Sequence, residues 1–183
     1  MMKKLLFSIL FLIGIFMTLT NGLSIVDAQD NIGELYPKTI TNNLTQIFGE
    51  PFYKEISSQD SSKVLNVEDG NIKTYNIHIA TGILKDVGNV TDKSTFITTH
   101  QTDGNTSTSI GNGTITTKDG EIANYTGHDL GITDNNGTQT YRGIQIFQTD
   151  SDGKLSFLDN LIGLYEYKYW SNGTKSGIMW EWK

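Results

Sequence analysis

The sequence contains no cysteine. This absence excludes disulfide bonds, and it excludes the lipid-modified cysteine that can follow a bacterial export signal. A domain without disulfide bonds depends on its own hydrophobic core, and a single domain of this length is large enough to bury one.

Clusters of basic residues are also missing. The chain has 14 Lys and Arg against 20 Asp and Glu, which gives a formal net charge of −6. An acidic domain without a basic patch repels a phosphate backbone, so we expect no nucleic-acid partner.

Motifs for common chemistry are absent as well. The chain has no nucleophile elbow, Walker loop, dinucleotide fingerprint or zinc-binding helix motif. Its three histidines, His78, His100 and His128, fall on different predicted strands without the paired spacing of metal ligands. Asp150-Ser151-Asp152-Gly153 resembles the start of a calcium loop but lacks the later ligands, so it is predicted to be a turn. We therefore predict no cofactor, no metal site and no catalytic residue.

Residues 1–28 have the pattern of an export signal. Two lysines precede a charge-free apolar run, Leu5–Leu19, and Val26-Asp27-Ala28 supplies small residues for a cleavage site. At about 15 residues, the run is shorter than the roughly 20 that span a bilayer. We predict cleavage before Gln29, a location outside the cytoplasmic membrane and no membrane span in the mature chain. A retained membrane anchor is the alternative.

Turn signals recur at wide spacing in the rest of the chain. Residues 29–49 are predicted to form a flexible leader or a short helix around Thr41–Phe48, and residues 50–183 to form the main domain. Six Asp-Gly or Asn-Gly pairs then mark turns with long strands between them, which makes consecutive strands antiparallel neighbours. These pairs are Asp69-Gly70, Asp103-Gly104, Asp119-Gly120, Asn136-Gly137, Asp152-Gly153 and Asn172-Gly173.

Glycines inside the predicted strands favour a closed sheet. Glycine weakens a strand interior, so repeated glycines there usually mark bulges or strong coiling. We predict an all-β fold, an antiparallel meander of about eight or nine long strands closed into a small β-barrel. A two-sheet sandwich is the alternative. The glycines are Gly82, Gly111, Gly113, Gly127, Gly131, Gly143, Gly163 and Gly177.

The last hairpin predicts an aromatic wall. If Asn172-Gly173 is a two-residue turn, Tyr165 lies opposite Trp180 and Gly163 lies opposite Trp182. We therefore expect Trp182 to pack inside on Gly163, and Trp180 to pack beside Tyr165.

A polar row is predicted on the neighbouring strands. Two-residue turns at Asn136-Gly137 and Asp152-Gly153 would place His128 opposite Gln145, and Gln145 opposite Asn160. These three side chains would share a face with Tyr141 and line one end of the interior, hydrogen-bonded to each other, to water or to a ligand. In the alternative this face is outside, and Ile144 and Ile146 point inward.

Three segments carry a family resemblance. Gly113–Glu121, Gly153–Asn160 and Trp180–Lys183 resemble motifs of a family of exported archaeal β proteins to which no activity is assigned. The resemblance runs from about Pro51 to the C-terminus and implies no catalytic residue. At the level of fold alone, the expected barrel is similar to lipocalins and to allene oxide cyclase-like barrels, which licenses no function.

Two function classes follow from the predicted barrel, and an isomerase or cyclase ranks third. The first is a non-enzymatic barrel that binds a small hydrophobic or aromatic ligand inside. The second is a glycosylated cell-surface structural or interaction module with a filled barrel. An interior cavity of about 300 Å³ or more would favour the first class. The expected ligand-binding residues are His128, Tyr141, Gln145, Asn160, Tyr165, Tyr167, Trp180 and Trp182.

Seven Asn-x-Ser/Thr sequons follow the predicted signal. In an exported chain, some of them are candidate glycan sites. Asn136 and Asn172 fall on predicted turns and are expected to be the most accessible. The full set is Asn43, Asn89, Asn105, Asn112, Asn124, Asn136 and Asn172.

Overall fold

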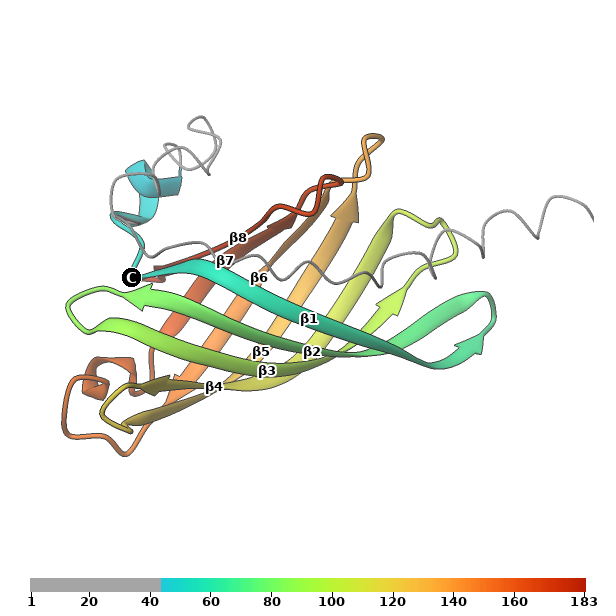
Figure 1. Cartoon of the computed structure of the whole chain (residues 1–183). Coiled ribbons are helices and arrows are strands. Elements are labelled where there is room, and N and C mark those ends of the chain that lie inside the picture. Colours follow the sequence, from blue (N-terminus) through green and yellow to red (C-terminus); the bar gives the residue numbers. More distant parts are fainter. Residues whose placement is uncertain (1–43) are drawn as a thin grey trace, which may run out of the picture. The chain divides into compact units, whose positions relative to one another are not determined.

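The computed structural model describes residues 44–183 (Figure 1). The predicted export signal, its cleavage site and most of the predicted leader lie outside these residues. Residues 44–48 are helical, inside the segment where a short helix was expected. No helix in the described part of the chain is long and apolar enough to cross a membrane.

Eight antiparallel strands in chain order close into a barrel, from β1 through β8 and back to β1 (Figure 1). This confirms the predicted all-β meander and its closure. A short 3-10 helix, η2 (Ser156–Leu158), lies between β6 and β7. The strands are β1 (Tyr53–Glu68), β2 (Asn71–Leu84), β3 (Gly88–His100), β4 (Thr106–Thr117), β5 (Ile122–Thr133), β6 (Gln139–Gln148), β7 (Ile162–Tyr169) and β8 (Lys175–Glu181).

The apolar core lies at one end of the barrel. Phe147 is fully buried there, and its ring packs edge-on to Phe52 with centroids 6.1 Å apart and lies 5.2 Å from the Tyr125 ring. The connection between β6 and β7 inserts Leu155 and Leu158, both 0% exposed, into the same cluster. This connection therefore closes the apolar end, and burial of its leucines holds it there.

Large side chains lie over glycines on neighbouring strands inside the barrel. A Cβ built on Gly113 would lie 2.3 Å from the Tyr125 ring, and one on Gly82 would lie 2.3 Å from the Tyr53 ring. The Gly163 position is likewise occupied by Met179, whose sulfur would lie 2.6 Å from such a Cβ. The glycines at these positions thus make room for two tyrosine rings and a thioether inside the barrel.

Gly111 and Gly127 are direct neighbours on β4 and β5, and they provide a matched test of this packing. A Cβ on Gly111 would lie 2.1 Å from the backbone oxygen of Thr95, whereas one on Gly127 would meet side chains alone, the Phe96 ring at 3.1 Å and Gln145 Cγ at 3.6 Å. Because a backbone atom in a sheet cannot move aside, Gly111→Ala should lower the free energy of unfolding by about 2–3 kcal/mol and Gly127→Ala by about 1 kcal/mol or less. Urea melts of both variants measure the difference, and equal losses would contradict the packing described.

The aromatic register of the last hairpin was predicted wrongly. The loop has three residues, 171–173, because the Trp170 N–H donates to the Thr174 oxygen (2.9 Å) and the Gly173 N–H donates to the Trp170 oxygen (2.9 Å). Gly173 has φ of 88°, as the last residue of a three-residue hairpin loop requires, and an Asn-Gly pair suits this loop as well as a two-residue turn.

The slip of one residue changes every partner on β7 and β8. Tyr165 lies opposite Met179, not Trp180, and Gly163 lies opposite Glu181, not Trp182. Trp180 is buried, but it pairs with Leu164 on the other face of the strands. Trp182 follows the end of β8 and is 57% exposed, so it does not pack on Gly163.

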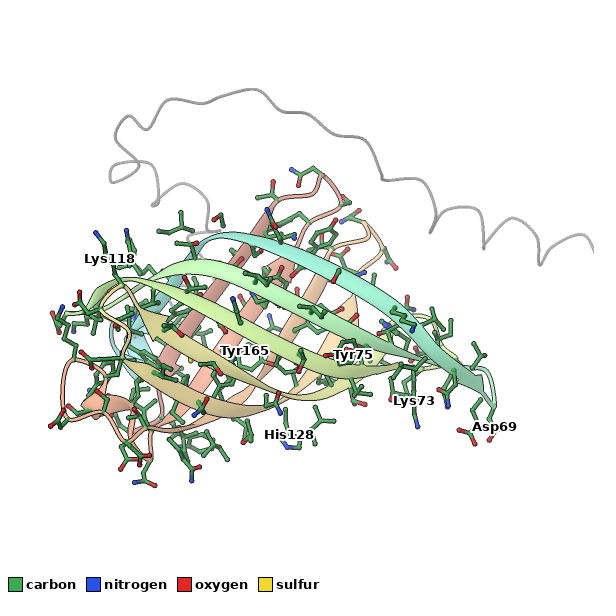
Figure 2. All side chains as sticks on the ribbon, turned by 60° about the horizontal axis from the view of Figure 1, so that its bottom comes forward. Asp69, Lys73, Tyr75, Lys118, His128 and Tyr165 are labelled. Carbon is green, nitrogen blue, oxygen red and sulfur yellow. The ribbon has the colours of Figure 1, made fainter. Side chains whose placement is uncertain are left out.

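The predicted polar row does not exist, for the same reason. The loop between β5 and β6 also has three residues, with the Gly137 N–H donating to the Asp134 oxygen (3.0 Å), so His128 pairs with Ile144. His128 is exposed on the outer face, and Figure 2 shows it pointing away from the barrel. Asn160 is exposed in the connection after η2, which replaces the expected hairpin at Asp152-Gly153. Only Gln145 of the three points inside.

Candidate functional site

The structure brings four of the eight predicted ligand-binding residues together in the interior. Tyr141, Tyr165 and Tyr167 occupy adjacent inward positions on β6 and β7. Gln145 lies deeper, 6% exposed between Gly127 and Gly163, which flank it on β5 and β7. The other four do not join them: His128 and Trp180 lie on the other face of the sheet, and Asn160 and Trp182 lie outside the strands.

A charged cluster that sequence reasoning missed surrounds these tyrosines. The two ring nitrogens of His78 each face a carboxylate, with Nδ1 2.5 Å from Asp60 Oδ1 and Nε2 3.3 Å from Glu55 Oε2. Asp60 Oδ2 also accepts hydrogen bonds from the Lys175 ammonium and from the Tyr167 hydroxyl, the latter at 3.3 Å. Four strands, β1, β2, β7 and β8, therefore meet at one carboxylate.

The protonation states of this cluster follow from its partners. Burial lowers the pKa of His78, but hydrogen bonds and charge from Asp60 and Glu55 outweigh it and raise that pKa to about 10. Burial raises the pKa of Asp60, but hydrogen bonds from His78 and Lys175 bring it down to about 2. The imidazole is thus a cation with both N–H groups engaged, which makes it a poor general base.

Two further carboxyl groups inside the barrel bond to tyrosines. The Tyr125 hydroxyl donates to Asp92 Oδ1 at 2.8 Å, and the Tyr165 hydroxyl donates to Asp129 Oδ2 at 2.5 Å. Burial raises the pKa of Asp92 to about 6, and burial likewise raises the pKa of Asp129. Asp92 is only 4% exposed, so a soluble substrate cannot reach it.

The His78 cluster makes stability depend on pH. The pKa of His78 is about 6.5 in the unfolded chain and about 10 in the folded protein, so the folded state binds an extra proton between these values. The resulting stabilisation is complete below about pH 6.5 and is lost as pH rises through about 10. Thermal melts from pH 6 to pH 10 should show the wild-type Tm falling by about 5 °C more than that of His78→Gln. Parallel curves for the two proteins would show that the cluster does not hold the proton.

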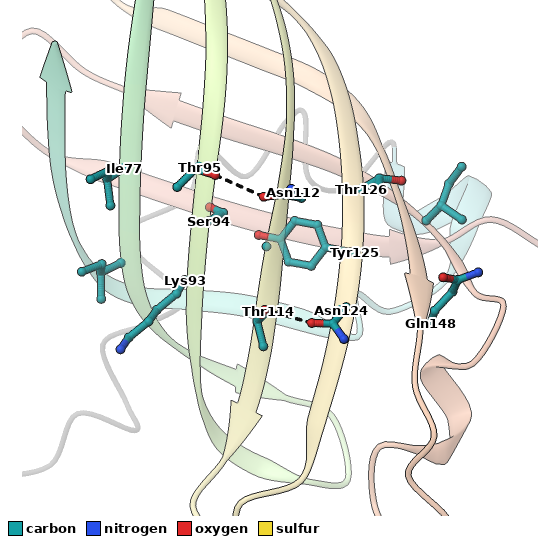
Figure 3. A pocket seen from close by; sticks show the side chains of 13 residues that line it. Ile77, Lys93, Ser94, Thr95, Asn112, Thr114, Asn124, Tyr125, Thr126 and Gln148 are labelled. Atoms are coloured by element: carbon teal, nitrogen blue, oxygen red, sulfur yellow. Dashed lines mark hydrogen bonds between the residues drawn. The ribbon is translucent and has the colours of Figure 1, made fainter.

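A groove of about 810 Å³ lies on the outside of the barrel, across β2–β6 (Figure 3). The Thr95 hydroxyl donates to Asn112 Oδ1 at 3.1 Å, and the Thr114 hydroxyl donates to Asn124 Oδ1 at 3.0 Å. These bonds orient the two amides and leave each Nδ2 group as a donor toward the groove. The lining residues are Ile77, Ile79, Lys93, Ser94, Thr95, Asn112, Gly113, Thr114, Asn124, Tyr125, Thr126, Ile146 and Gln148.

A second hollow of about 460 Å³ continues this groove. It shares Thr95, Asn112 and Thr126 with the first and extends to Tyr75 and His128. The floor of the combined groove includes the backbone of β4 at its Gly-Asn-Gly segment, residues 111–113. Because these glycines have no inward side chains, the β4 backbone lies directly on the Phe96 and Tyr125 rings, which leaves a hollow on the outer side.

The groove face carries no carboxylate. The only acidic residues on β2–β6 are Asp92 and Asp129, and both point inward to tyrosine hydroxyls. Lys93 is the one charged residue that lines the groove. In a protein of net charge −6, this face is therefore locally neutral to basic.

Within residues 44–183, no group of three or more His, Cys, Asp and Glu side chains is placed to hold a metal ion. No family model, curated protein or solved structure matches the chain. One feature of the sequence could have pointed to the groove. Ile, Thr and Asn alternate with other residues on either side of the glycines of β4.

Proposed function

We propose that this protein is an exported, non-enzymatic binding module that holds a saccharide chain in the groove on the outside of a filled barrel. The observation that carries this proposal is the carboxylate-free groove across β2–β6, with its amides held by threonine hydroxyls. The export signal predicted from residues 1–28 supplies the extracellular location.

The chemistry of the lining favours a sugar. Asn112 Nδ2, Asn124 Nδ2 and the Lys93 ammonium are donors, so the groove suits a ligand rich in acceptor oxygens. Ile77, Ile79 and Ile146 present methyl groups that can pack on the C–H faces of pyranose rings. Five strands spaced by about 4.8 Å make the groove about 19 Å across, a length that suits a chain rather than a single small molecule.

The interior supports the first expected function less well. A hydrophobic ligand inside the barrel needs space beside the aromatic side chains, but Tyr53, Tyr125 and Met179 already lie over glycines there. Both hollows described above open on the outer face. The geometry therefore favours the interaction module over the ligand-holding barrel.

Removing the two groove amides provides the test. Calorimetric titration would use cellohexaose, chitohexaose and laminarihexaose as neutral probes, with hexagalacturonate as an acidic one. Loss of two hydrogen-bonding amides in Asn112→Ala/Asn124→Ala should weaken binding of the preferred probe by about 10- to 100-fold.

Asn89→Ala is the matched control, because Asn89 is an exposed asparagine on β3 that does not line the groove. Its affinity should equal that of wild type. Absence of binding for all four probes at millimolar concentration, or equal binding by the double variant and the control, would refute the proposal.

Glycosylation of the chain itself is a second part of the proposal. All six sequon asparagines in the described residues are exposed. Asn136 and Asn172 lie in hairpin loops, whereas Asn112 and Asn124 lie within paired strands with their amides bonded to threonines.

In protein purified from its own source, we expect glycans on Asn136 and Asn172 and none on Asn112 and Asn124. Peptide mass mapping before and after deglycosylation measures this occupancy. A glycan on Asn112 or Asn124 would contradict the prediction, and it would also close the groove to a soluble saccharide.

A further inference from the structure

The β1 strand has one edge without a backbone partner over most of its length. It pairs with β2 as far as Glu68, but with β8 only at Tyr53 and Lys54. Among the described residues, no strand pairs with the second edge over Lys63–Glu68. Figure 1 shows the β1–β2 hairpin extending past β8, and Figure 2 shows Asp69 at its tip, whereas β3 follows β2 as far as Ile72.

The projecting part of this edge carries exposed apolar side chains. Val64 is 53% exposed, Leu65 is 50% exposed and Val67 is 64% exposed. A strand edge with unpaired backbone groups and apolar side chains is a template for pairing with another strand. Lys63 and Glu68 flank the apolar residues at the two ends of the segment.

The six residues from Lys63 to Glu68 are complementary to a second copy of themselves. In an antiparallel pair related by a two-fold axis, Lys63 would oppose Glu68 of the second copy, and Val64 would oppose Val67. Opposed residues must lie on the same face of the sheet. In a regular strand, residues five apart lie on opposite faces, so this pairing would fail.

The bulge in β1 removes this obstacle. The register against β2 shifts between Val64 and Asn66, so Lys63 pairs with Tyr75 and Glu68 with Asn71, which lie on one face. Val64 pairs with Thr74 and Val67 with Ile72, which lie on the other face. The extra residue, Leu65, therefore brings both pairs into the arrangement that a two-fold dimer needs.

We propose that two copies of this protein associate by antiparallel pairing of their β1 edges over Lys63–Glu68. The pairing places two opposite-charge contacts outside two Val64–Val67 pairs, with Leu65 opposite Asn66 at the two-fold axis, and joins the two sheets through backbone hydrogen bonds. No residue of this segment lines the groove, so the inference does not rest on the proposed saccharide binding.

Charge reversal tests the pairing register. Sedimentation velocity of the purified protein up to about 0.5 mM should show a monomer–dimer equilibrium. In Lys63→Glu, two like-charge contacts replace two attractive ones, which should weaken dimerisation by at least about 10-fold. In Lys63→Glu/Glu68→Lys, the contacts are opposite in charge again, and the dimer affinity should return to within about 3-fold of wild type.

Lys73→Glu is the control, because Lys73 lies on β2 of the same hairpin, away from the unpaired edge. It makes the same change of net charge and should leave dimerisation unchanged. Thermal melts establish that each variant is folded. A wild-type protein that stays monomeric at all concentrations would overturn the proposal, as would a dimer that Lys63→Glu does not weaken or that the double reversal does not restore.

Discussion

The interaction of Asp60 with His78 and Lys175 is the constraint on which the closed barrel depends. Closure requires β1 to meet β8, yet the backbone ladder between them covers only Tyr53 and Lys54. Above these residues the seam is held by side chains, because one carboxylate on β1 bonds to a cation on β8, a hydroxyl on β7 and an imidazolium on β2. A partly buried charge network of this kind is stabilising only while every member is satisfied. Of the inward tyrosines on β7, Tyr167 belongs to this network through its bond to Asp60, and Tyr165 bonds to Asp129 on β5.

The distribution of polarity reverses the usual pattern of a small β domain. The two carboxylates of β2–β6, those of Asp92 and Asp129, lie inside, and each accepts a hydrogen bond from a tyrosine, while Ile, Thr and Asn cover the outer face of these strands. Inside the barrel, these two carboxylates bond to tyrosine hydroxyls, whereas the outer face keeps amide N–H donors on Asn112 and Asn124 that are directed toward the groove. This division is the physical reason why we propose that recognition takes place on the outer face.

The architecture could be predicted from the sequence, but the facing of individual side chains could not. Asp-Gly and Asn-Gly pairs mark the position of a turn whether its loop has two or three residues. The order of the strands could therefore be predicted from these pairs. Asn172-Gly173 suits both a two-residue and a three-residue loop, and the difference of one residue exchanged the partners of Trp180 and Trp182. The same ambiguity at Asn136-Gly137 misplaced His128. The alternation of Ile, Thr and Asn around the glycines of β4 is visible in the sequence, but it does not predict the groove by itself, because the hollow arises where β4 rests on rings from neighbouring strands, a long-range contact.

The contact of rings with glycines has a consequence for how this sequence can vary. The Tyr125 ring fills the space that a side chain on Gly113 would occupy. A larger residue in place of the glycine alone would overlap with the tyrosine ring, and a smaller residue in place of the tyrosine alone would leave a void beside Asp92. Each single change therefore costs stability. A paired change that moves the bulky side chain from one strand to the other keeps the total volume and costs less. Viable substitutions in the interior should therefore come as pairs across adjacent strands, with the two members far apart in sequence and strongly non-additive in their effects. At such ring-on-glycine positions the sequence should therefore change by coupled steps, whereas exposed positions on the outer face of β2–β6 can change one residue at a time.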